Sequence, residues 1–250
     1  ESKMKGEYIN TIDYEENSIK REKAYMKDKD EAMVNSAKKG LAQTYINRRI
    51  LYKNQGEYVN ALNNQLSSLA IWEELNAKDK IALSYVNISI IYKYLEDYEK
   101  ALDYQLKSVE LRQETGNLEG QASAYSNIGT LLKLRGELDS ALIYYKKSLN
   151  LELKKGNPLG ISASYHNIGN LYFDMGDVAK AIDFQKKSLS IDQTTGSKKG
   201  MASSYVNLGE YYLELKQYSR ATNNLNKGLE LAVEIGSLKE QKYARKWLHE

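Results

Sequence analysis

The hydrophobic positions of this chain follow a helical period. The segment YVNLGEYYLELKQYSRA covers residues 205–221, and its apolar or small side chains recur at i, i+3, i+4 and i+7, at Tyr205, Leu208, Gly209 and Tyr212. A polar turn follows around 215–217. A second helix is then marked by Tyr218, Ala221, Leu225 and Leu229. Because the alternation typical of a β-strand is absent here, this segment predicts a helix, a turn and a second helix.

The same pattern recurs at intervals of 40 residues. Asparagine keeps this step at Asn47, Asn87, Asn127, Asn167 and Asn207. Tyrosine keeps it at Tyr45, Tyr85, Tyr125, Tyr165 and Tyr205, and alanine at Ala61, Ala101, Ala141, Ala181 and Ala221. The predicted units are 40–79, 80–119, 120–159, 160–199 and 200–239. Residues 240–250 begin a sixth unit or form a C-terminal capping helix, and residues 1–39 form a degenerate unit or N-terminal capping helices.

Glycine marks fixed places in each unit. The turn between the two helices contains Gly56, Gly136 and Gly176, and the end of the second helix, where a left-handed residue is needed, contains Gly116, Gly156, Gly196 and Gly236. Gly129, Gly169 and Gly209 lie inside the first helix, which predicts that a neighbouring helix packs very closely there. Arg49 and Ser89 replace this glycine in the first two units. Arg49 therefore predicts either a looser joint or a side chain that reaches out to solvent.

A helix pair of this size cannot bury its own apolar face, so the repeats predict an all-α, right-handed solenoid of antiparallel helix pairs. The units combine an aromatic residue, an Asn-aliphatic-Gly triplet, a Gly-acidic turn and the alanine column. This combination resembles the tetratricopeptide repeat, although the units exceed the usual length of about 34 residues. The long units are similar to those of kinesin light chains, of GoLoco-binding adaptors and of bacterial regulators that sense peptides or carry histidine-kinase modules.

The resemblance implies that the first helix of each unit lines a concave groove. It also implies that the asparagine column hydrogen-bonds the backbone of a bound peptide, since an amide offers both donors and an acceptor. The alternative is that each asparagine only braces the stack. Other side chains expected to face the groove are Ile50, Ile90, Thr130, His166, Asn170 and Glu210. The apolar pair Ile50 and Ile90 either receives the apolar end of a ligand or is covered by residues 1–39.

Three lysines also repeat at 40 residues, at Lys53, Lys93 and Lys133. They form either a basic track for an acidic peptide or a solvated face that compensates the helix dipole. No flanking groove position is basic, which argues against a clamp for terminal carboxylates. The many tyrosines are expected to pack in the core.

Composition narrows the classes of function. The chain has 36 basic and 33 acidic residues, so the net charge of +3 predicts no nucleic-acid partner. There is no cysteine, and the two histidines, His166 and His249, lie far apart in the sequence with no catalytic or metal motif around them. We therefore expect no enzyme, no metal site and no cofactor. No apolar run is long enough to predict membrane insertion, and we expect a cytoplasmic protein, with a periplasmic sensor segment as the alternative.

The chain begins without methionine, and we expect it to be a piece of a longer protein. The sequence thus predicts a non-catalytic protein–protein interaction module that binds an extended peptide or partner segment in its groove. The alternative is a sensory segment of a larger bacterial signalling protein, a histidine kinase or transcription regulator. A structural spacer is a third possibility. The oligomeric state stays open.

Overall fold

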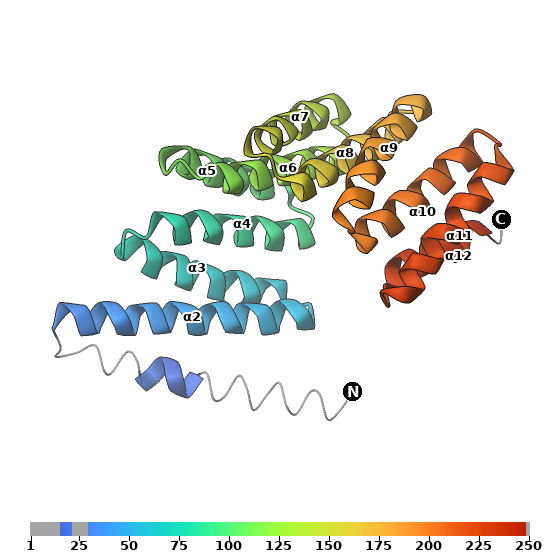
Figure 1. Ribbon diagram of the computed structural model, residues 1–250. Helices are drawn as coiled ribbons and strands as arrows, with labels where there is room; N and C mark the ends of the chain where they lie inside the picture. Colours follow the sequence, from blue (N-terminus) through green and yellow to red (C-terminus); the bar gives the residue numbers. More distant parts are fainter. Residues whose placement is uncertain (1–15, 22–29, 249–250) are drawn as a thin grey trace, which may run out of the picture. The chain divides into compact units, whose positions relative to one another are not determined.

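The protein is built from antiparallel α-helices joined by short turns (Figure 1). The computed structural model describes residues 16–21 and 30–248, which contain helices and turns and no β-strand. A short helical segment at 16–21 comes first. The helices that follow are α2 (Glu31–Gln55), α3 (Tyr58–Glu74), α4 (Lys78–Tyr94), α5 (Tyr98–Glu114), α6 (Leu118–Leu134), α7 (Leu138–Lys155), α8 (Pro158–Asp174), α9 (Val178–Thr195), α10 (Lys198–Glu214), α11 (Tyr218–Glu234) and α12 (Leu238–Leu248). The predicted all-α fold of stacked helix pairs is confirmed.

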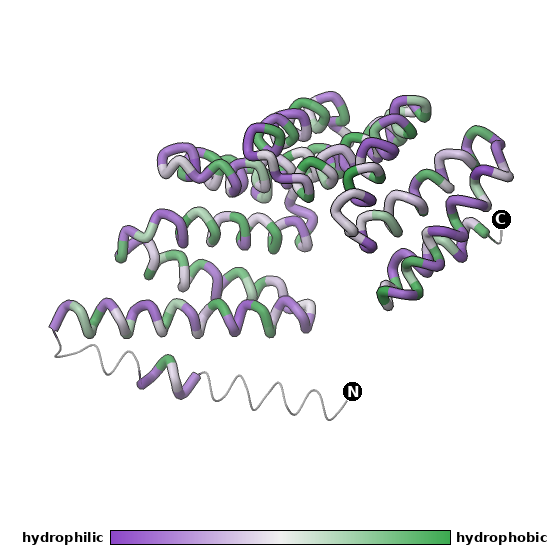
Figure 2. The backbone as a smooth tube through the Cα atoms, viewed as in Figure 1, coloured by the Kyte–Doolittle hydropathy of each residue, from purple (hydrophilic) through white to green (hydrophobic). Residues whose placement is uncertain are grey.

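The chain forms two compact units, the first ending at Gly120 and the second beginning at Gln121. In the first unit, α3 packs between α2 and α4, and α4 packs on α5. In the second, each helix from α7 to α12 packs on the next one along the chain. Figure 2 shows hydrophobic and hydrophilic residues alternating along every helix. Each helix therefore presents an apolar stripe to its neighbours within its unit.

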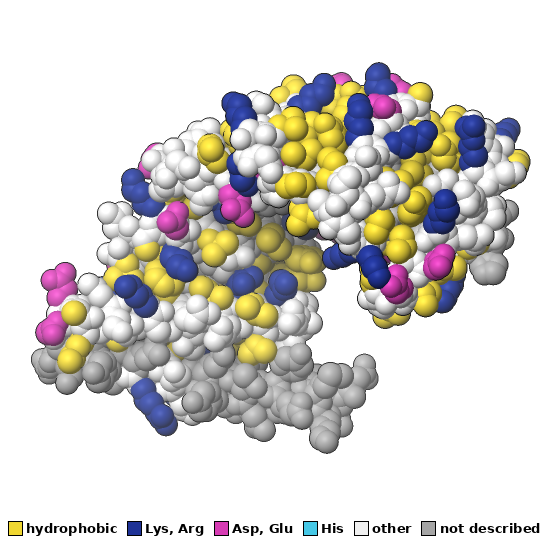
Figure 3. Space-filling model, viewed as in Figure 1, with side chains coloured by type: hydrophobic (Ala, Val, Ile, Leu, Met, Phe, Trp, Pro, Cys, Tyr) yellow, Lys and Arg dark blue, Asp and Glu magenta, His cyan; other side chains and the backbone are white. Residues whose placement is uncertain are grey.

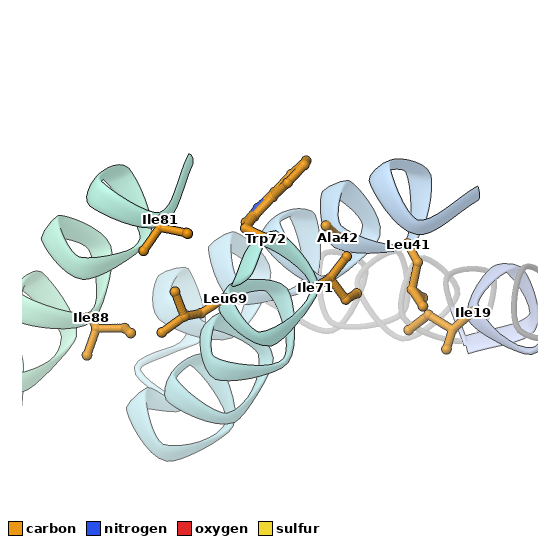
Figure 4. Close-up of a cluster of buried hydrophobic side chains, with 8 residues drawn as sticks. All are labelled: Ile19, Leu41, Ala42, Leu69, Ile71, Trp72, Ile81 and Ile88. Carbon is orange, nitrogen blue, oxygen red and sulfur yellow. The ribbon is translucent and has the colours of Figure 1, made fainter. Parts of the chain in front are cut away.

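The main apolar cluster of the first unit joins consecutive helices (Figure 4). Leu41 and Ala42 come from α2, Leu69, Ile71 and Trp72 from α3, and Ile81 and Ile88 from α4. Ile19 of the segment at 16–21 is buried against the same cluster. Most of the predicted N-terminal region, residues 1–15 and 22–29, lies outside the described residues.

Each turn between α2 and α12 contains one residue in the left-handed region, and these residues are spaced 20 apart along the chain. Seven of them are glycines, with φ between 62° and 82°: Gly56, Gly116, Gly136, Gly156, Gly176, Gly196 and Gly236. A Cβ atom added to any of these would meet nothing within 4 Å. Backbone conformation, not space, therefore favours glycine in the turns, as predicted. Asn76, Glu96 and Lys216 occupy the same place with φ of 49°, 61° and 56°.

The glycines inside the first helices mark close helix packing, and this prediction is confirmed. A Cβ atom on Gly129 would lie 2.7 Å from the ring of Tyr145, and one on Gly169 would lie 3.2 Å from the backbone oxygen of Ala181. Gly209 is crowded in the same way by Leu225. These glycines let each first helix approach the second helix of its own pair.

Arg49 replaces this glycine on α2, and the joint between α2 and α3 differs accordingly. The Arg49 side chain is 8% exposed, its Nε has no hydrogen-bond partner among the described residues, and burial lowers its pKa. Ser68 on α3 also has an unpaired hydroxyl in this part of the chain. The equivalent serines Ser108 and Ser148 donate to backbone oxygens of their partner helices at 2.9 and 2.8 Å. The unpaired atoms show that polar groups at this joint are less well satisfied than at the later joints, and the buried arginine does not agree with the solvent-reaching alternative.

A further set of glycines lies in the first turn of α6, α8 and α10, at Gly120, Gly160 and Gly200. A Cβ atom at each would collide with a side chain from the end of the preceding helix, namely Arg112, Glu152 and Asp192 respectively. All three charged side chains are buried. Between α11 and α12 the small and the large residue change places. The small residue, Ala232, lies at the end of α11, and the large one, the buried Glu240, lies in the first turn of α12.

Candidate functional site

The asparagine column in the second unit ties successive first helices together. Asn167 on α8 donates to Ser126 Oγ on α6 at 3.1 Å, and Asn207 on α10 donates to Asn170 Oδ1 on α8 at 2.6 Å. Asn127 on α6 has no side-chain hydrogen bond in the described part of the chain. Bracing therefore accounts for part of the role of Asn167 and Asn207, and it does not account for Asn127.

In the first unit the column makes fewer contacts. Asn47 is exposed and accepts a hydrogen bond from Gln43 of its own helix at 3.0 Å. Asn87 is half-buried on α4 and has no side-chain hydrogen bond to any described residue. Neither amide links two helices here, so both keep hydrogen-bonding capacity for another molecule.

The pair Asn170 and Asn207 uses only part of its hydrogen-bonding capacity. Asn170 Oδ1 accepts from Asn207 Nδ2 and also from the Tyr211 hydroxyl at 2.5 Å. Asn207 Nδ2 lies 3.4 Å from Gln185 Oε1 as well. The Asn170 Nδ2 group and the Asn207 Oδ1 atom have no partner among the described residues. One donor and one acceptor thus remain on adjacent side chains, which matches the two polar groups of a peptide bond.

These two asparagines line a hollow of about 280 Å³ in the second unit, formed by side chains of α6, α8, α10 and α12. Of the predicted groove residues, five meet here: Lys133, His166, Asn170, Asn207 and Glu210. The hollow also contains residues that were not predicted, including Phe173, Asp174, Tyr211, Lys239, Glu240 and Tyr243. Glu240 and Tyr243 were not predicted because the sequence leaves the role of 240–250 open, and Lys239 was not predicted because the last unit was expected to end at this residue.

His166 is electrically neutral at pH 7. Burial, together with the positive charges of Lys239 and Lys133, lowers the pKa of its imidazole to about 4, and Glu240 opposes this shift. Its Nδ1 lies 3.1 Å from Gln185 Nε2. The imidazole therefore accepts a hydrogen bond within the helix stack and carries no charge in the hollow.

Glu210 and Tyr211 are also perturbed by burial. Desolvation raises the pKa of the half-buried Glu210 carboxyl, an effect that the nearby Lys246 opposes. Burial, followed by the negative charges of Glu210 and Asp174, raises the pKa of the Tyr211 hydroxyl, so that this group remains a neutral donor. Thr130, another predicted groove residue, donates to Ser126 O at 3.1 Å and lies 3.1 Å from the Tyr145 hydroxyl. Its hydroxyl is therefore engaged within the stack.

The repeating lysines have different surroundings. Lys133 pairs with Asp174 of the next first helix, at 2.5 Å. Lys53 and Lys93 lie in the last turns of α2 and α4, where a cation compensates the helix dipole, and Lys93 Nζ lies 5.5 Å from the ring centroid of Tyr94. On the face shown in Figure 3, lysine and arginine side chains are dispersed and do not gather into one patch. These contacts favour the solvated, dipole-compensating interpretation.

The predicted apolar pair lies in the first unit. Ile50 on α2 is 40% exposed, and Ile90 on α4 is half-buried. The described segment at 16–21 contacts α2 elsewhere, through Ile19 in the cluster with Leu41 and through Glu16, whose carboxylate lies 3.3 Å from Arg48. Ile50 therefore keeps an exposed apolar surface.

Residues 16–21 and 30–248 contain no group of three or more His, Cys, Asp or Glu side chains placed to hold a metal ion. His249 lies outside these residues. Among the described helices, none is both long enough and apolar enough to cross a membrane.

Stacked pairs of helices with a recurring 40-residue pattern define an α-helical repeat protein. The sequence model of the tetratricopeptide repeat matches residues 40–114, 80–152 and 160–232. The chain therefore belongs to the tetratricopeptide repeat family, as its residues predicted. No curated protein matches it.

Solved structures share this fold at low sequence identity. BtubC (BKLC) from P. vanneervenii is 18% identical, with a TM-score of 0.75 and 92% of each chain covered. Aspartyl phosphate phosphatase F from Bacillus subtilis is 14% identical, with a TM-score of 0.78, over 86% of this chain and 56% of that chain. The Rap conjugation gene regulator of plasmid pLS20, in complex with the Phr* peptide, is 17% identical, with a TM-score of 0.68, over 82% of this chain and 56% of that chain.

Proposed function

We propose that this protein is a non-catalytic interaction module that binds an extended peptide, or an extended segment of a partner protein, on its first helices. The observation that carries this proposal is the unused donor of Asn170 and the unused acceptor of Asn207, side by side in the hollow of the second unit. A peptide bond needs one acceptor and one donor from its receptor. Amides meet both needs without selecting a charge.

Two further features support binding of a peptide backbone. Asn127 lines a separate hollow of about 270 Å³ in the second unit, together with Ser123, Ser126 and Ser164, and its amide has no partner in the described chain. In the first unit, Asn87 is equally without a partner. A helix stack gains nothing from an unpaired amide, so a ligand gives these residues a role. The similar Rap regulator was solved with a bound peptide.

A regulatory segment of a larger signalling protein is the second candidate, favoured by the likeness to a gene regulator that holds a peptide. In that role, peptide binding would slow hydrogen exchange in helices that the peptide does not touch. Exchange that slows only in the contacted first helices would favour a simple interaction module.

The test begins with selection of a random-peptide display library on the wild-type protein. Selected peptides are then measured by fluorescence anisotropy against Asn127→Ala, Asn170→Ala and Asn150→Ala. Asn150 is a matched control, because it is exposed on the second helix α7 and has no side-chain hydrogen bond among the described residues. We expect Asn127→Ala to bind about fivefold more weakly, the effect of a lost hydrogen bond of about 1 kcal/mol.

The melting temperature separates binding from bracing. Asn127→Ala should have the same melting temperature as the wild type, whereas Asn207→Ala should have a lower one because it loses the hydrogen bond to Asn170. A library without enriched peptides, or enriched peptides that bind both Asn127→Ala and Asn170→Ala as tightly as the wild type, would contradict the proposal.

A further inference from the structure

Glu210 differs from the other carboxylates of the second unit's hollow because it has no partner. Asp174 pairs with Lys133, and Glu240 accepts hydrogen bonds from Ser203 and Ser237. The Glu210 side chain makes no hydrogen bond and no ion pair with any described residue, although it is half-buried and lines the hollow. The hollow therefore contains one partly desolvated carboxylate, that of Glu210, which accepts no hydrogen bond from any described residue.

An unpaired, partly desolvated carboxylate is unfavourable, and this is why the pKa of Glu210 is raised. The charges of Lys246 and Lys133 act on Glu210 and oppose its pKa shift, but neither lysine forms an ion pair with it. Lys133 pairs with Asp174, and Lys246 Nζ lies 4.1 Å from the ring centroid of Trp247. A donor or cation from another molecule would restore the favourable interaction.

The walls around Glu210 suit a flat cation. Tyr243 of α12 is 50% exposed, and the half-buried Phe173 rests on the buried ring of Tyr211 with ring centroids 4.5 Å apart, so aromatic surface from Tyr243 and Phe173 lies in the same hollow as the carboxylate. Guanidinium groups bind carboxylates through paired donors and also stack on aromatic rings. His166 is neutral and does not repel a cation.

We propose that the hollow of the second unit binds a basic side chain of the ligand peptide, arginine in preference to lysine. The guanidinium group of this arginine pairs with the Glu210 carboxylate and stacks against the aromatic side chains of the hollow. This inference rests on the proposed function, since Asn170 and Asn207 would hold the peptide backbone beside it. A volume of about 280 Å³ accommodates one long side chain. Exposed Lys239 lies in the same lining and has no partner among the described residues, so it favours an anionic group as the competing occupant.

The test uses small probes, so it does not depend on finding the natural peptide. N-acetyl-arginine amide, the uncharged isostere N-acetyl-citrulline amide and N-acetyl-glutamate amide are titrated into ¹⁵N-labelled protein and followed by NMR. We expect saturable shifts at Gly209 and its neighbours from the arginine probe, and binding at least tenfold weaker for the citrulline probe. Glu210→Gln should weaken arginine binding about tenfold, whereas Lys239→Gln should leave it unchanged or stronger.

Several results would overturn the inference. These are equal binding of arginine and citrulline, preference for the glutamate probe, unchanged arginine binding by Glu210→Gln, or no saturable shift up to the solubility of the arginine probe. The melting temperature of Glu210→Gln confirms that the variant is folded. The proposed arginine subsite and the proposed peptide binding can be refuted independently of each other. Library peptides that depend on Asn127 but show no enrichment of basic residues would remove the subsite and leave peptide binding in place.

Discussion

The pH dependence of stability offers a direct test of the environment assigned to His166. An imidazole has a pKa of 6.5 when solvated, and burial beside two lysines lowers that of His166 to about 4. Between these values the unfolded chain binds a proton that the folded protein excludes. The contribution of neutral His166 to stability is therefore complete above pH 6.5 and is lost progressively as the pH falls from 6.5 towards 4.

The size of this effect follows from the two pKa values. One pKa unit corresponds to about 1.36 kcal/mol, so the full difference is about 3 kcal/mol below pH 4, and the loss between pH 7 and pH 5 is about 2 kcal/mol. The perturbation is His166→Asn, because the asparagine oxygen can take the place of Nδ1 as acceptor from Gln185.

The assay is urea denaturation of wild type and His166→Asn at pH 7 and pH 5, followed by circular dichroism. The two proteins share every other titrating group, including Asp192 and Glu210, whose raised pKa values act in the opposite direction. Those contributions cancel in the comparison. We expect the wild type to lose about 2 kcal/mol more than the variant on acidification. Equal losses in the two proteins would refute the neutral state of this half-buried imidazole.

Three substitutions test the packing rules of the repeats by thermal unfolding. Glu96→Gly should stabilise the protein by about 0.5–1 kcal/mol, because Glu96 has a φ of 61° in a turn where other repeats place glycine. Arg49→Ser should raise the melting temperature by removing a buried charge and allowing Ser68 to find an acceptor on α2. Gly129→Ala should destabilise by about 1–3 kcal/mol, because its methyl group would meet the buried ring of Tyr145 at 2.7 Å.

Each substitution has an outcome that would count against it. A lower melting temperature for Glu96→Gly would mean that the glutamate side chain contributes more than the backbone strain removes. Arg49→Ser that melts below wild type would show that the arginine stabilises the first joint. Gly129→Ala that melts like wild type would show that α6 and α7 can separate without loss.

Residues whose chemistry repeats along the chain predicted the fold well. Two sets of glycines each meet one backbone requirement, namely a left-handed turn or close packing of the first helix. A glycine that repeats at the same position of each unit is therefore enough to reveal that requirement. The role of Gly160 was not visible in this way. Its neighbour Glu152 belongs to a column that also holds arginine and aspartate, and residues without common chemistry give no periodic signal.

The candidate site was predictable only in part, for a similar reason. The sequence placed His166, Asn170 and Glu210 on one face because helical spacing determines which residues share a face. The sequence did not show that the Asn207 amide already donates a hydrogen bond to Asn170, or that Lys133 forms an ion pair with Asp174. These pairs connect different helices, and their geometry depends on how closely the helices pack.

The joints between repeats also determine which repeats the chain can lose. Removal of residues 160–199 would place Glu152 against Gly200, another small residue, so a shortened protein should still fold. Removal of residues 200–239 would instead place the buried carboxylate of Asp192 against that of Glu240. Two buried carboxylates in contact are unfavourable. We therefore expect shortening of this protein to be tolerated at the first of these joints and destabilising at the second.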